Sequence, residues 1–417
     1  MSLLLLHSPP PPPPTADEVA AWLAEDVAAR PARVERLRER LAREGVDAYL
    51  GVSRENSRYL TGFVLAEGEE KVAGDSGRFV ISGDEVVVLA DVRYLEAARE
   101  DCPGARIEES YNQLVERWPA IVRSLKPVRA PGRRGRRTRV RRVAVEAAHV
   151  SHDLWTGLAA AVPDVELLPA GPWVEELRAT KEPSEIARIR AACGVADAAL
   201  DRLVREVRAG MTERELALRL EWDMRTHGAE AVAFEVTCLS GPRAALPHGA
   251  PGDRRVAKGE ALLFDFGAQV AGYRSDMTRT FFVGEPSGPH LRIYLLLQAA
   301  QEDVFHELAR AAATGVIPTG PEVDAVARKV VTNAGFGARF GHGLGHGIGL
   351  ATHERPFLGR RAAPVTLPTP TVFSVEPGVY IPGDTGVRIE DLIHFDVATR
   401  TAERLTGFTR DLAVLGE

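Results

Sequence analysis

A hairpin pattern with one acid on each side of its turn constrains this chain most. Residues 261–282, ALLFDFGAQVAGYRSDMTRTFF, contain two runs rich in β-branched and aromatic residues around a glycine-containing turn, which is typical of a β-hairpin. A turn centred between Val270 and Ala271 places Asp265 opposite Asp276. Carboxylates that face each other across two strands repel and destabilise the pair. The pattern therefore indicates that a bound cation offsets the repulsion.

A second predicted hairpin repeats this arrangement nearer the carboxyl end. Residues 371–395 form two alternating runs, and a turn centred on Gly383 places Glu376 opposite Glu390. Pro377 favours an extended Glu376, because a proline disfavours helical backbone in the residue before it. Two hairpins with facing acids favour a common binding function over solvated turn residues.

Three histidines lie between the hairpins. The segment GHGLGHGIGLATHERP, residues 341–356, carries His342, His346 and His353. The first two have the spacing of a metal pair on a helix, but five glycines in residues 341–349 argue against a helix. The glycines suit a phosphate-binding loop as well, yet the strand and helix that flank such loops are not evident. Four carboxylates and a histidine are suitable ligands for two divalent ions such as Mn²⁺, Co²⁺ or Zn²⁺.

The composition narrows the class of protein. With 417 residues, of which 45% are hydrophobic and 26% charged, the chain suits a globular protein of two or three domains. Its net charge of −6 gives no general attraction to nucleic acid or to a membrane surface. Three scattered cysteines, with no signal peptide and no long apolar run, fit a reducing compartment. We therefore expect a cytoplasmic protein without a nucleic-acid or membrane partner.

We expect a tail followed by two domains. Residues 1–15 include six consecutive prolines and predict a disordered, polyproline-type tail. Strand and helix patterns alternate over residues 16–179, which indicates an α/β domain. Within it, residues 129–142 hold eight arginines. A nucleic-acid patch is one interpretation, but no aromatic residue is interleaved, so a solvated surface loop is favoured. Over residues 180–417, helices alternate with antiparallel hairpins, an α+β pattern.

The motifs from residue 181 onward resemble those of the pita-bread metallopeptidases, in particular the Xaa-Pro aminopeptidases and the Xaa-Pro dipeptidases (prolidases). These motifs are LLFDFGAQVAGYRSDMTRTF, GHGLGHGIGLATHE, SVEPGVY and GVRIED. The segments NSRYLTGF and LADVRYLEAA resemble the family's smaller amino-terminal domain. The resemblance implies an α/β amino-terminal domain followed by an α+β pita-bread catalytic domain, built on antiparallel hairpins flanked by helices.

The resemblance also implies the roles of individual residues. The metal ligands carried over by motif are Asp265, Asp276, His346, Glu376 and Glu390. His248, His353 and Arg388 match substrate-binding residues. The implied catalytic residues are Glu376, His353 and His342, of which Glu376 is the expected proton acceptor and His353 the expected helper at the carbonyl oxygen.

The implied activity is that of a dinuclear-metal exopeptidase, which hydrolyses the Xaa-Pro bond at the amino terminus of peptides by attack of a metal-bridging hydroxide. Manganese is the expected metal, with cobalt or zinc as alternatives, and a homodimer is the expected assembly. The main alternative is an Xaa-Pro dipeptidase that acts on dipeptides only. Methionine aminopeptidases lack the amino-terminal domain and the arginine of GVRIED. A creatinase-like hydrolase lacks the metal ligands, and an inactive binding relative would have lost at least one of them.

Overall fold

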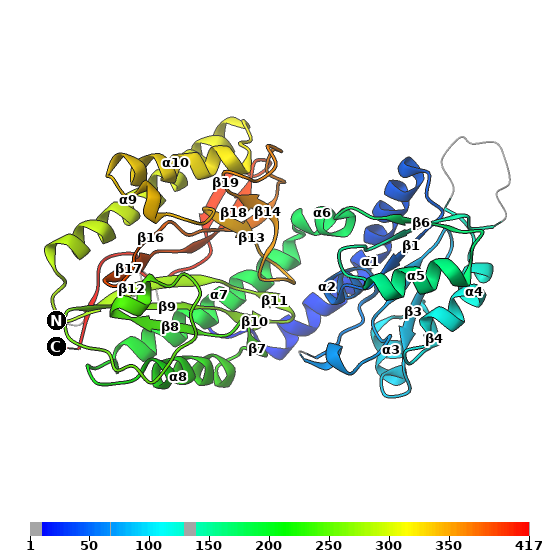
Figure 1. Ribbon diagram of the computed structural model, residues 1–417, viewed down its shortest axis with the longest axis horizontal. Coiled ribbons are helices and arrows are strands. Elements are labelled where there is room, and N and C mark those ends of the chain that lie inside the picture. Colours follow the sequence, from blue (N-terminus) through cyan, green and yellow to red (C-terminus); the bar gives the residue numbers. More distant parts are fainter. Residues whose placement is uncertain (1–10, 67, 129–138, 417) are drawn as a thin grey trace. The chain divides into compact units, whose positions relative to one another are not determined.

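The computed structural model describes residues 11–66, 68–128 and 139–416 (Figure 1). These residues divide into two compact units. The smaller unit comprises Leu23–Arg178, and the larger unit comprises the described residues up to Trp22 and from Ala179 onward. Among the described helices, none combines the length and the apolar character that a membrane span needs.

Two segments of biased composition lie partly outside the described residues. Of the expected disordered tail, residues 1–10 lie outside them, whereas Pro11 and Pro13 lie against glycines of the larger unit. Of the arginine-rich segment, residues 129–138 lie outside them. The expected solvated loop therefore stays a prediction.

A six-stranded mixed sheet forms the centre of the smaller unit. Its strands are β1 (Ala48–Gly51), β2 (Phe79–Ile81), β3 (Val86–Ala90), β4 (Arg106–Glu109), β5 (Arg142–Val145) and β6 (Glu166–Pro169). The helices in this part of the chain are α1 (Ala16–Glu44), α2 (Arg54–Thr61), α3 (Leu95–Asp101), α4 (Leu114–Ser124), α5 (His152–Ala161) and α6 (Trp173–Ala179). The strand order is β4-β3-β2-β1-β5-β6, with β1 antiparallel to β2 and parallel to β5. This arrangement agrees with the expected α/β class.

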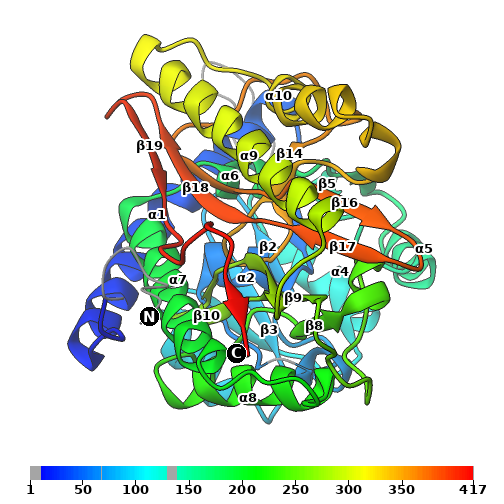
Figure 2. The same ribbon diagram turned by 90° about the vertical axis from the view of Figure 1, so that its left-hand side faces the viewer.

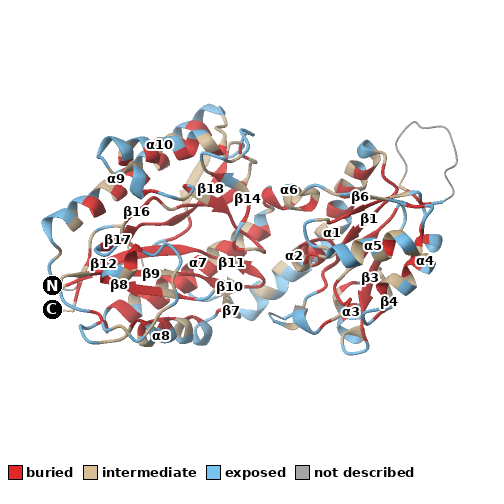
Figure 3. Ribbon diagram, in the orientation of Figure 1, coloured by how far each residue is buried: buried red, intermediate tan, exposed pale blue. Residues whose placement is uncertain are grey.

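Burial explains why these segments form strands. The four residues of β1 are all buried, as are the three of β2, so both faces of the sheet centre are covered. Helices α4 and α5 supply Trp118 and Leu158, which are both 0% exposed. Figure 3 shows the same pattern in both units, with largely buried strands and helices that keep one exposed face. Apolar runs of this kind are typical of strands covered on two sides.

The larger unit contains more strands and four long helices. Its strands are β7 (Ala231–Val232), β8 (Thr237–Ser240), β9 (Glu260–Phe266), β10 (Ala268–Val270), β11 (Tyr273–Arg274), β12 (Met277–Val283), β13 (Gly345–Gly347), β14 (Glu354–Leu358), β15 (Thr371–Val375), β16 (Gly378–Ile381), β17 (Thr385–Arg388), β18 (Asp391–Asp396), β19 (Thr401–Arg404) and β20 (Val414–Leu415). Its long helices are α7 (Pro183–Val204), α8 (Glu213–Thr226), α9 (Gly288–Thr314) and α10 (Gly320–Asn333).

Two principal sheets lie between pairs of these helices. Their strand orders are β20-β12-β9-β8 and β14-β13-β15-β18-β19, and short sheets β11-β10-β7 and β16-β17 extend the two hairpins. Helices α7 and α8 cover a first hydrophobic core, and α9 and α10 cover a second. Figure 2 shows α8 on one side of the strands and α9 with α10 on the other.

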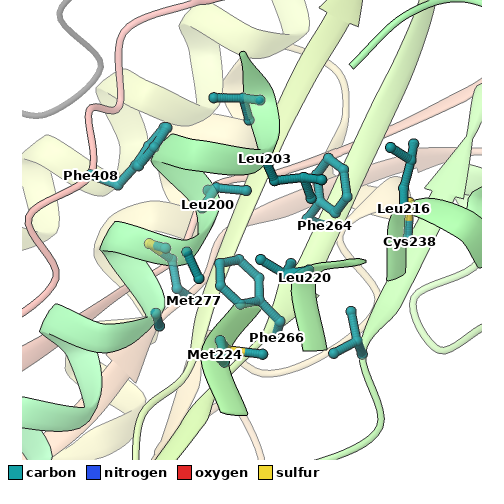
Figure 4. Close-up of a cluster of buried hydrophobic side chains, with 14 of the residues drawn as sticks. Leu200, Leu203, Leu216, Leu220, Met224, Cys238, Phe264, Phe266, Met277 and Phe408 are labelled. Carbon is teal, nitrogen blue, oxygen red and sulfur yellow. The ribbon is translucent and has the colours of Figure 1, made fainter. Parts of the chain in front are cut away.

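Strand β9 separates the two cores through the alternation of its side chains. Leu262 and Phe264 belong to the first core, where Phe264 lies among side chains of α7 and α8 (Figure 4). Leu263 belongs to the second core. Because successive side chains of a strand point to opposite faces, Asp265 shares the face of Leu263. The first acid of the hairpin is therefore directed away from the first core.

The first hairpin turns one residue later than the sequence analysis expected. Val270 pairs with Tyr273, so the turn consists of Ala271 and Gly272, with φ angles of 46° and 85°. Positive φ at both central residues is what a two-residue type I′ turn requires. The turn was misplaced because a residue such as alanine rarely adopts positive φ.

The later turn changes which residues face each other. Asp265 pairs with Thr278, so the expected direct pairing of Asp265 with Asp276 is wrong. The register differs by two positions, and an even difference leaves every side chain on its expected face. Asp265 and Asp276 are therefore diagonal neighbours on one face of the hairpin instead of direct partners.

The second hairpin has the expected register. Val375 faces Asp391 where β15 pairs with β18, and β16 pairs with β17 in the same register. Glu376 and Glu390 lie between these two paired regions and stand opposite each other. Their predicted juxtaposition is confirmed.

Substitutions of two leucines in α8 test whether the first core is assigned correctly. Leu220 is 0% exposed and belongs to this core, whereas Leu218 is 59% exposed on the same helix. Replacing Leu220 with alanine should lower the free energy of unfolding by about 2–5 kcal/mol, because the cavity left behind collapses only partly. The matched variant Leu218→Ala should change it by less than about 0.5 kcal/mol. Denaturant unfolding of both variants is the measurement, and equal losses would contradict this assignment of the core.

Candidate metal centre

One cavity in the larger unit gathers every residue that the sequence analysis selected. Its volume is about 1080 Å³. Its lining includes Asp265, Asp276, His346, Glu376, Glu390, His248, His342, His353 and Arg388. These side chains come from the two hairpins, the glycine-rich segment between them and the loop before β9. The structure thus brings together all of the candidate metal-binding, catalytic and substrate-binding residues.

Three of these side chains form a tight cluster. Asp276, His346 and Glu390 are buried, and each offers a ligand atom that lies within 4.8 Å of the other two. Among the described residues, Asp276 Oδ1 and Glu390 Oε1 have no hydrogen-bond partner. Leaving a buried carboxylate oxygen unsatisfied is costly. The two oxygens therefore point to a cation as their missing partner.

The ring of His346 is oriented for the same role. Its Nδ1 lies 3.1 Å from the carbonyl oxygen of Gly347, and a carbonyl only accepts, so Nδ1 carries the hydrogen. Burial lowers the pKa of His346, which leaves Nε2 unprotonated at neutral pH. This Nε2 lies 3.7 Å from Asp276 Oδ2 and 3.5 Å from Glu376 Oε1. A lone pair aimed at carboxylate oxygens is unfavourable without a cation, and a second hydrogen bond to a backbone carbonyl is typical of ligating histidines.

Burial and mutual repulsion also perturb the acids. Loss of hydration and then the charge of Glu390 raise the pKa of Asp276 well above its ordinary value. Loss of hydration and the charge of Glu376 do the same to the pKa of Glu390. The pKa of Glu376 is raised as well, chiefly by burial. These acids, the two orphaned oxygens and the free Nε2 fit a divalent metal site, to which Asp265 and Glu376 add further carboxylates in the same cavity.

Arg388 neutralises only one of the four acids. Its Nη2 donates to Asp265 Oδ2 at 2.6 Å and its Nε donates to Thr278 Oγ1 at 2.8 Å. Thr278 Oγ1 in turn donates to Glu390 Oε2 at 2.7 Å. Arg388 therefore reaches Glu390 through the hydroxyl of Thr278.

A chain of hydrogen bonds fixes the state of His342. Arg388 Nη1 donates to Tyr380 Oη at 2.7 Å, and Tyr380 Oη lies 2.9 Å from His342 Nε2. His342 Nδ1 lies 2.7 Å from the carbonyl oxygen of Gly343 and must donate to it. Nε2 therefore accepts from the tyrosine hydroxyl, whose pKa burial raises to about 12. Both ring nitrogens of His342 are thus engaged by hydrogen bonds within the protein, and its expected catalytic role stays a prediction.

His353 lies beside the cluster of Asp276, His346 and Glu390 but is not one of its members. Its ring centroid is 4.0 Å from that of His346. Loss of hydration, with the neighbouring rings of His346 and His248, lowers the pKa of His353 to about 4. A neutral His353 at neutral pH can donate one hydrogen bond into the cavity.

Arg279 connects the two hairpins behind the site. It is 1% exposed and donates to the carbonyl oxygens of Thr278 at 3.0 Å and Glu390 at 2.5 Å. It also donates to Asp391 Oδ1 at 2.6 Å and to the carbonyl oxygen of Phe408 at 2.7 Å. One buried guanidinium thereby fixes the backbone that carries Glu390.

A buried ion pair holds the loop that carries His353. Lys181 Nζ lies 2.7 Å from Glu354 Oε1, and both side chains are almost completely buried. A Cβ atom on Gly349 would lie 2.6 Å from the same Glu354 oxygen. Glycine at this position therefore allows the carboxylate to approach the loop.

Sequence reasoning missed two residues of the site, Thr278 and Tyr380. Thr278 follows Asp276 by two positions, and strand alternation predicts that both face the cavity. Tyr380 stands in the motif SVEPGVY but received no role. Hydrogen bonds of this kind depend on side chains from several strands, so spacing along one strand identifies only the candidates.

Comparison with protein families supplies an independent result. Residues 187–396 match the model of metallopeptidase family M24. The chain belongs to this family. Residues 33–180 match the creatinase/prolidase amino-terminal domain. As an M24 member the chain is a metallopeptidase, and the expected pairing of an α/β amino-terminal domain with a pita-bread domain is confirmed.

Relatives of this M24 protein cover nearly its whole length. A peptidase of Bacillus subtilis named YqhT is 34% identical over 387 residues, which cover 92% of this chain and 100% of the relative. The structure of an Xaa-Pro dipeptidase from Bacillus anthracis matches with a TM-score of 0.79 at 32% identity, covering 92% of this chain and 99% of that one. The structure of an X-Pro aminopeptidase from Thermotoga maritima matches with a TM-score of 0.78 at 32% identity and the same coverage. The chain is thus an M24 metallopeptidase of the prolidase type.

The raised pKa of Asp276 predicts how the metal-free protein responds to pH. A carboxyl group whose folded pKa exceeds its ordinary value of 3.8 stabilises the fold only at low pH. That contribution is lost as the pH rises through the folded pKa. As the pH rises above the ordinary value of 3.8, chelator-treated wild type should therefore lose stability relative to Asp276→Asn.

Thermal melts of both proteins across this range are the measurement. The lowered pKa values of the histidines contribute an opposite trend, but that trend is common to both proteins. Asp253→Asn is the matched control, because the Asp253 side chain is 84% exposed. Parallel curves for wild type and Asp276→Asn would show that the carboxylates are hydrated and unstrained.

Proposed function

We propose that this protein is an Xaa-Pro exopeptidase with two divalent metal ions held by Asp265, Asp276, His346, Glu376 and Glu390. The observation that carries the proposal is the cluster of Asp276, His346 and Glu390, whose ligand atoms lie within 4.8 Å of one another. Two orphaned carboxylate oxygens and an unprotonated Nε2 belong to the same three residues. Names of the structural neighbours, an Xaa-Pro dipeptidase and an X-Pro aminopeptidase, support the substrate class.

In the proposed hydrolysis of the Xaa-Pro bond, each side chain has a separate role. Two divalent ions, when bound, supply Lewis-acid activation of water and of the peptide carbonyl. Glu376 accepts the proton of the attacking water and returns it to the leaving nitrogen, a task that suits a carboxylate with a raised pKa. That nitrogen requires a proton because an Xaa-Pro bond is a tertiary amide without an N–H group. His353 donates a hydrogen bond to the carbonyl oxygen as negative charge develops on it.

Arg388 has two tasks in this proposal. Its ion pair with Asp265 holds that carboxylate in place, and its contact with Thr278 orients Glu390. His248 lines the same cavity from the loop before β9, where it can contact the proline ring. We propose manganese as the metal, since carboxylate-rich sites suit hard cations.

The cavity size supports an aminopeptidase as the first candidate. A volume of about 1080 Å³ lies slightly above the usual range of ligand pockets, roughly 300–1,000 Å³, and leaves room for a peptide longer than two residues. A dipeptidase is the second candidate, because Arg360 and Arg361 line the cavity and are exposed. Neither arginine has an ion-pair partner among the described residues, so both are available to hold a free carboxylate.

The proposal extends to assembly and location. Cys102, Cys193 and Cys238 are all buried and free, which suits a reducing cytoplasm. The exposed Trp222 of α8, at 71%, offers an apolar surface for a homodimer. A native molecular mass by light scattering tests the dimer.

Substrate assays test the proposed activity. The chelated protein should hydrolyse neither Xaa-Pro dipeptides nor Xaa-Pro-Xaa tripeptides, and added manganese should restore hydrolysis of the Xaa-Pro bond. Rates for the two peptide lengths then decide between the candidates. Full activity in a preparation shown by elemental analysis to be free of metal would refute the proposal.

Arg360 and Arg361 allow a direct test of the dipeptidase candidate. If the protein is a dipeptidase, Arg360→Ala with Arg361→Ala should raise the KM for dipeptides by about tenfold or more, the equivalent of one hydrogen-bonded charge contact. Tripeptide hydrolysis should be unaffected. Arg355→Ala is the matched control, because Arg355 lies in the same segment but does not line the cavity. An unchanged KM for dipeptides would show that these two arginines do not hold the substrate carboxylate.

Two histidine variants test the division of roles. His346→Ala should lose both metal and turnover, because it removes a ligand. His353→Ala should keep its metal and lose about a hundred- to a thousandfold in turnover, as expected for one donor to a developing oxyanion. Metal content and kcat are measured on the same preparations. Equal metal loss in both variants would make His353 a ligand and overturn its assigned role.

A further inference from the structure

A buried glycine in the interior of a helix needs a physical reason. Gly194 lies within the 22-residue helix α7 and is buried. Glycine in a helix interior is less stable than alanine by about 1 kcal/mol. A Cβ atom at this position would lie 2.6 Å from Pro11 Cγ and 3.2 Å from Pro11 Cδ. The ring of Pro11 therefore occupies the space that any larger residue would need.

A second glycine, Gly228, lies against Pro13, two residues after Pro11. Gly228, just after α8, has a φ of +119°, and its Cβ would lie 2.7 Å from Pro13 Cβ. The same Cβ would lie 3.4 Å from Val195 Cγ2. Pro11 and Pro13 thus rest on glycines from two different parts of the larger unit.

The first turn of α1 positions the preceding proline segment against α7. Thr15 caps the helix, because Glu18 N donates to Thr15 Oγ1 at 3.2 Å and Thr15 N donates to the Glu18 carboxylate at 2.8 Å. One turn further, Val19 and Trp22 pack against the first core together with Ala191 of α7. The chain before Thr15 therefore leaves a fixed helix end and runs over α7.

We propose that Gly194 and Gly228 form a binding surface for a polyproline segment, which the chain's own residues 11–14 occupy. A polyproline segment is stiff and has no backbone N–H groups to satisfy, so it loses little entropy on binding and needs no hydrogen bonds. The two glycines let its rings approach the backbone closely. Neither glycine lines the metal cavity, so this inference stands apart from the proposed function.

A spin label on the full-length chain measures the contact directly. Pro12 is exposed between the two contacting prolines, and Cys102, Cys193 and Cys238 are all buried, so Pro12→Cys takes the label selectively. The label should be immobilised in the otherwise natural chain. Adding Gly194→Ala should make it mobile, because the new methyl group displaces the Pro11 ring.

Gly288→Ala is the matched control for this experiment. Gly288 begins α9, and a Cβ there would meet no atom of the described residues within 4 Å, so the label should stay immobilised. A label that is already mobile in the natural chain, or that ignores Gly194→Ala, would overturn the proposal.

Melting temperatures provide a second test. In a chain with Pro11→Gly and Pro13→Gly, Gly194→Ala should raise the melting temperature by about 2–4 °C, the gain expected from helix propensity alone. In the natural chain the same substitution should give a smaller rise or a fall. With the matched change Pro12→Gly, it should behave as in the natural chain. An equal effect of Gly194→Ala in all three backgrounds would exclude the contact.

Discussion

The main physical constraint on this structure is the repulsion between carboxylates that are buried together without hydration. Asp276, Glu376 and Glu390 all have raised pKa values, and burial is the first cause for each. Two separate hairpins must be held against each other for these acids to meet, and like charges oppose that arrangement. The hydrogen bonds of Arg279 to both hairpins supply part of the constraint. A bound divalent ion would reverse the sign of the interaction, so that the same acids then stabilise the fold.

The protein's own positive charge is distributed so that the orphaned oxygens of the cluster stay available to a cation. Arg388 pairs with Asp265 and reaches Glu390 only through the hydroxyl of Thr278. Had a guanidinium contacted Asp276 or Glu390 directly, it would have satisfied the oxygens that are now orphaned. His346 is likewise available to a cation, because burial lowers its pKa and keeps its Nε2 free for a ligand role. The centre is thus electrostatically incomplete, and a cation completes it.

Much of this arrangement could be predicted from the sequence, because strand alternation is a local property. The faces of Asp265 and Asp276 were correct even though their pairing was not, since an error of two positions preserves the face. The turn was misjudged because Ala271 adopts a positive φ that its residue type disfavours. The roles of Tyr380 and Thr278 depend on contacts between strands, and the contacts of Pro11 and Pro13 with Gly194 and Gly228 depend on packing between distant segments. No pattern along the chain predicts such contacts.

The most direct test of the account is the number of protons that metal binding releases. Calorimetric titration of the chelator-treated protein with manganese, near pH 6.5 and in buffers of different ionisation enthalpy, measures this number. The account predicts a net release on the order of one proton per chain, because raised pKa values keep some of the acids protonated until a cation arrives. His346 adds little to the count, since its lowered pKa leaves it already neutral. Manganese binding without any proton release would contradict the claim that the buried carboxylates depend on a metal for their charge.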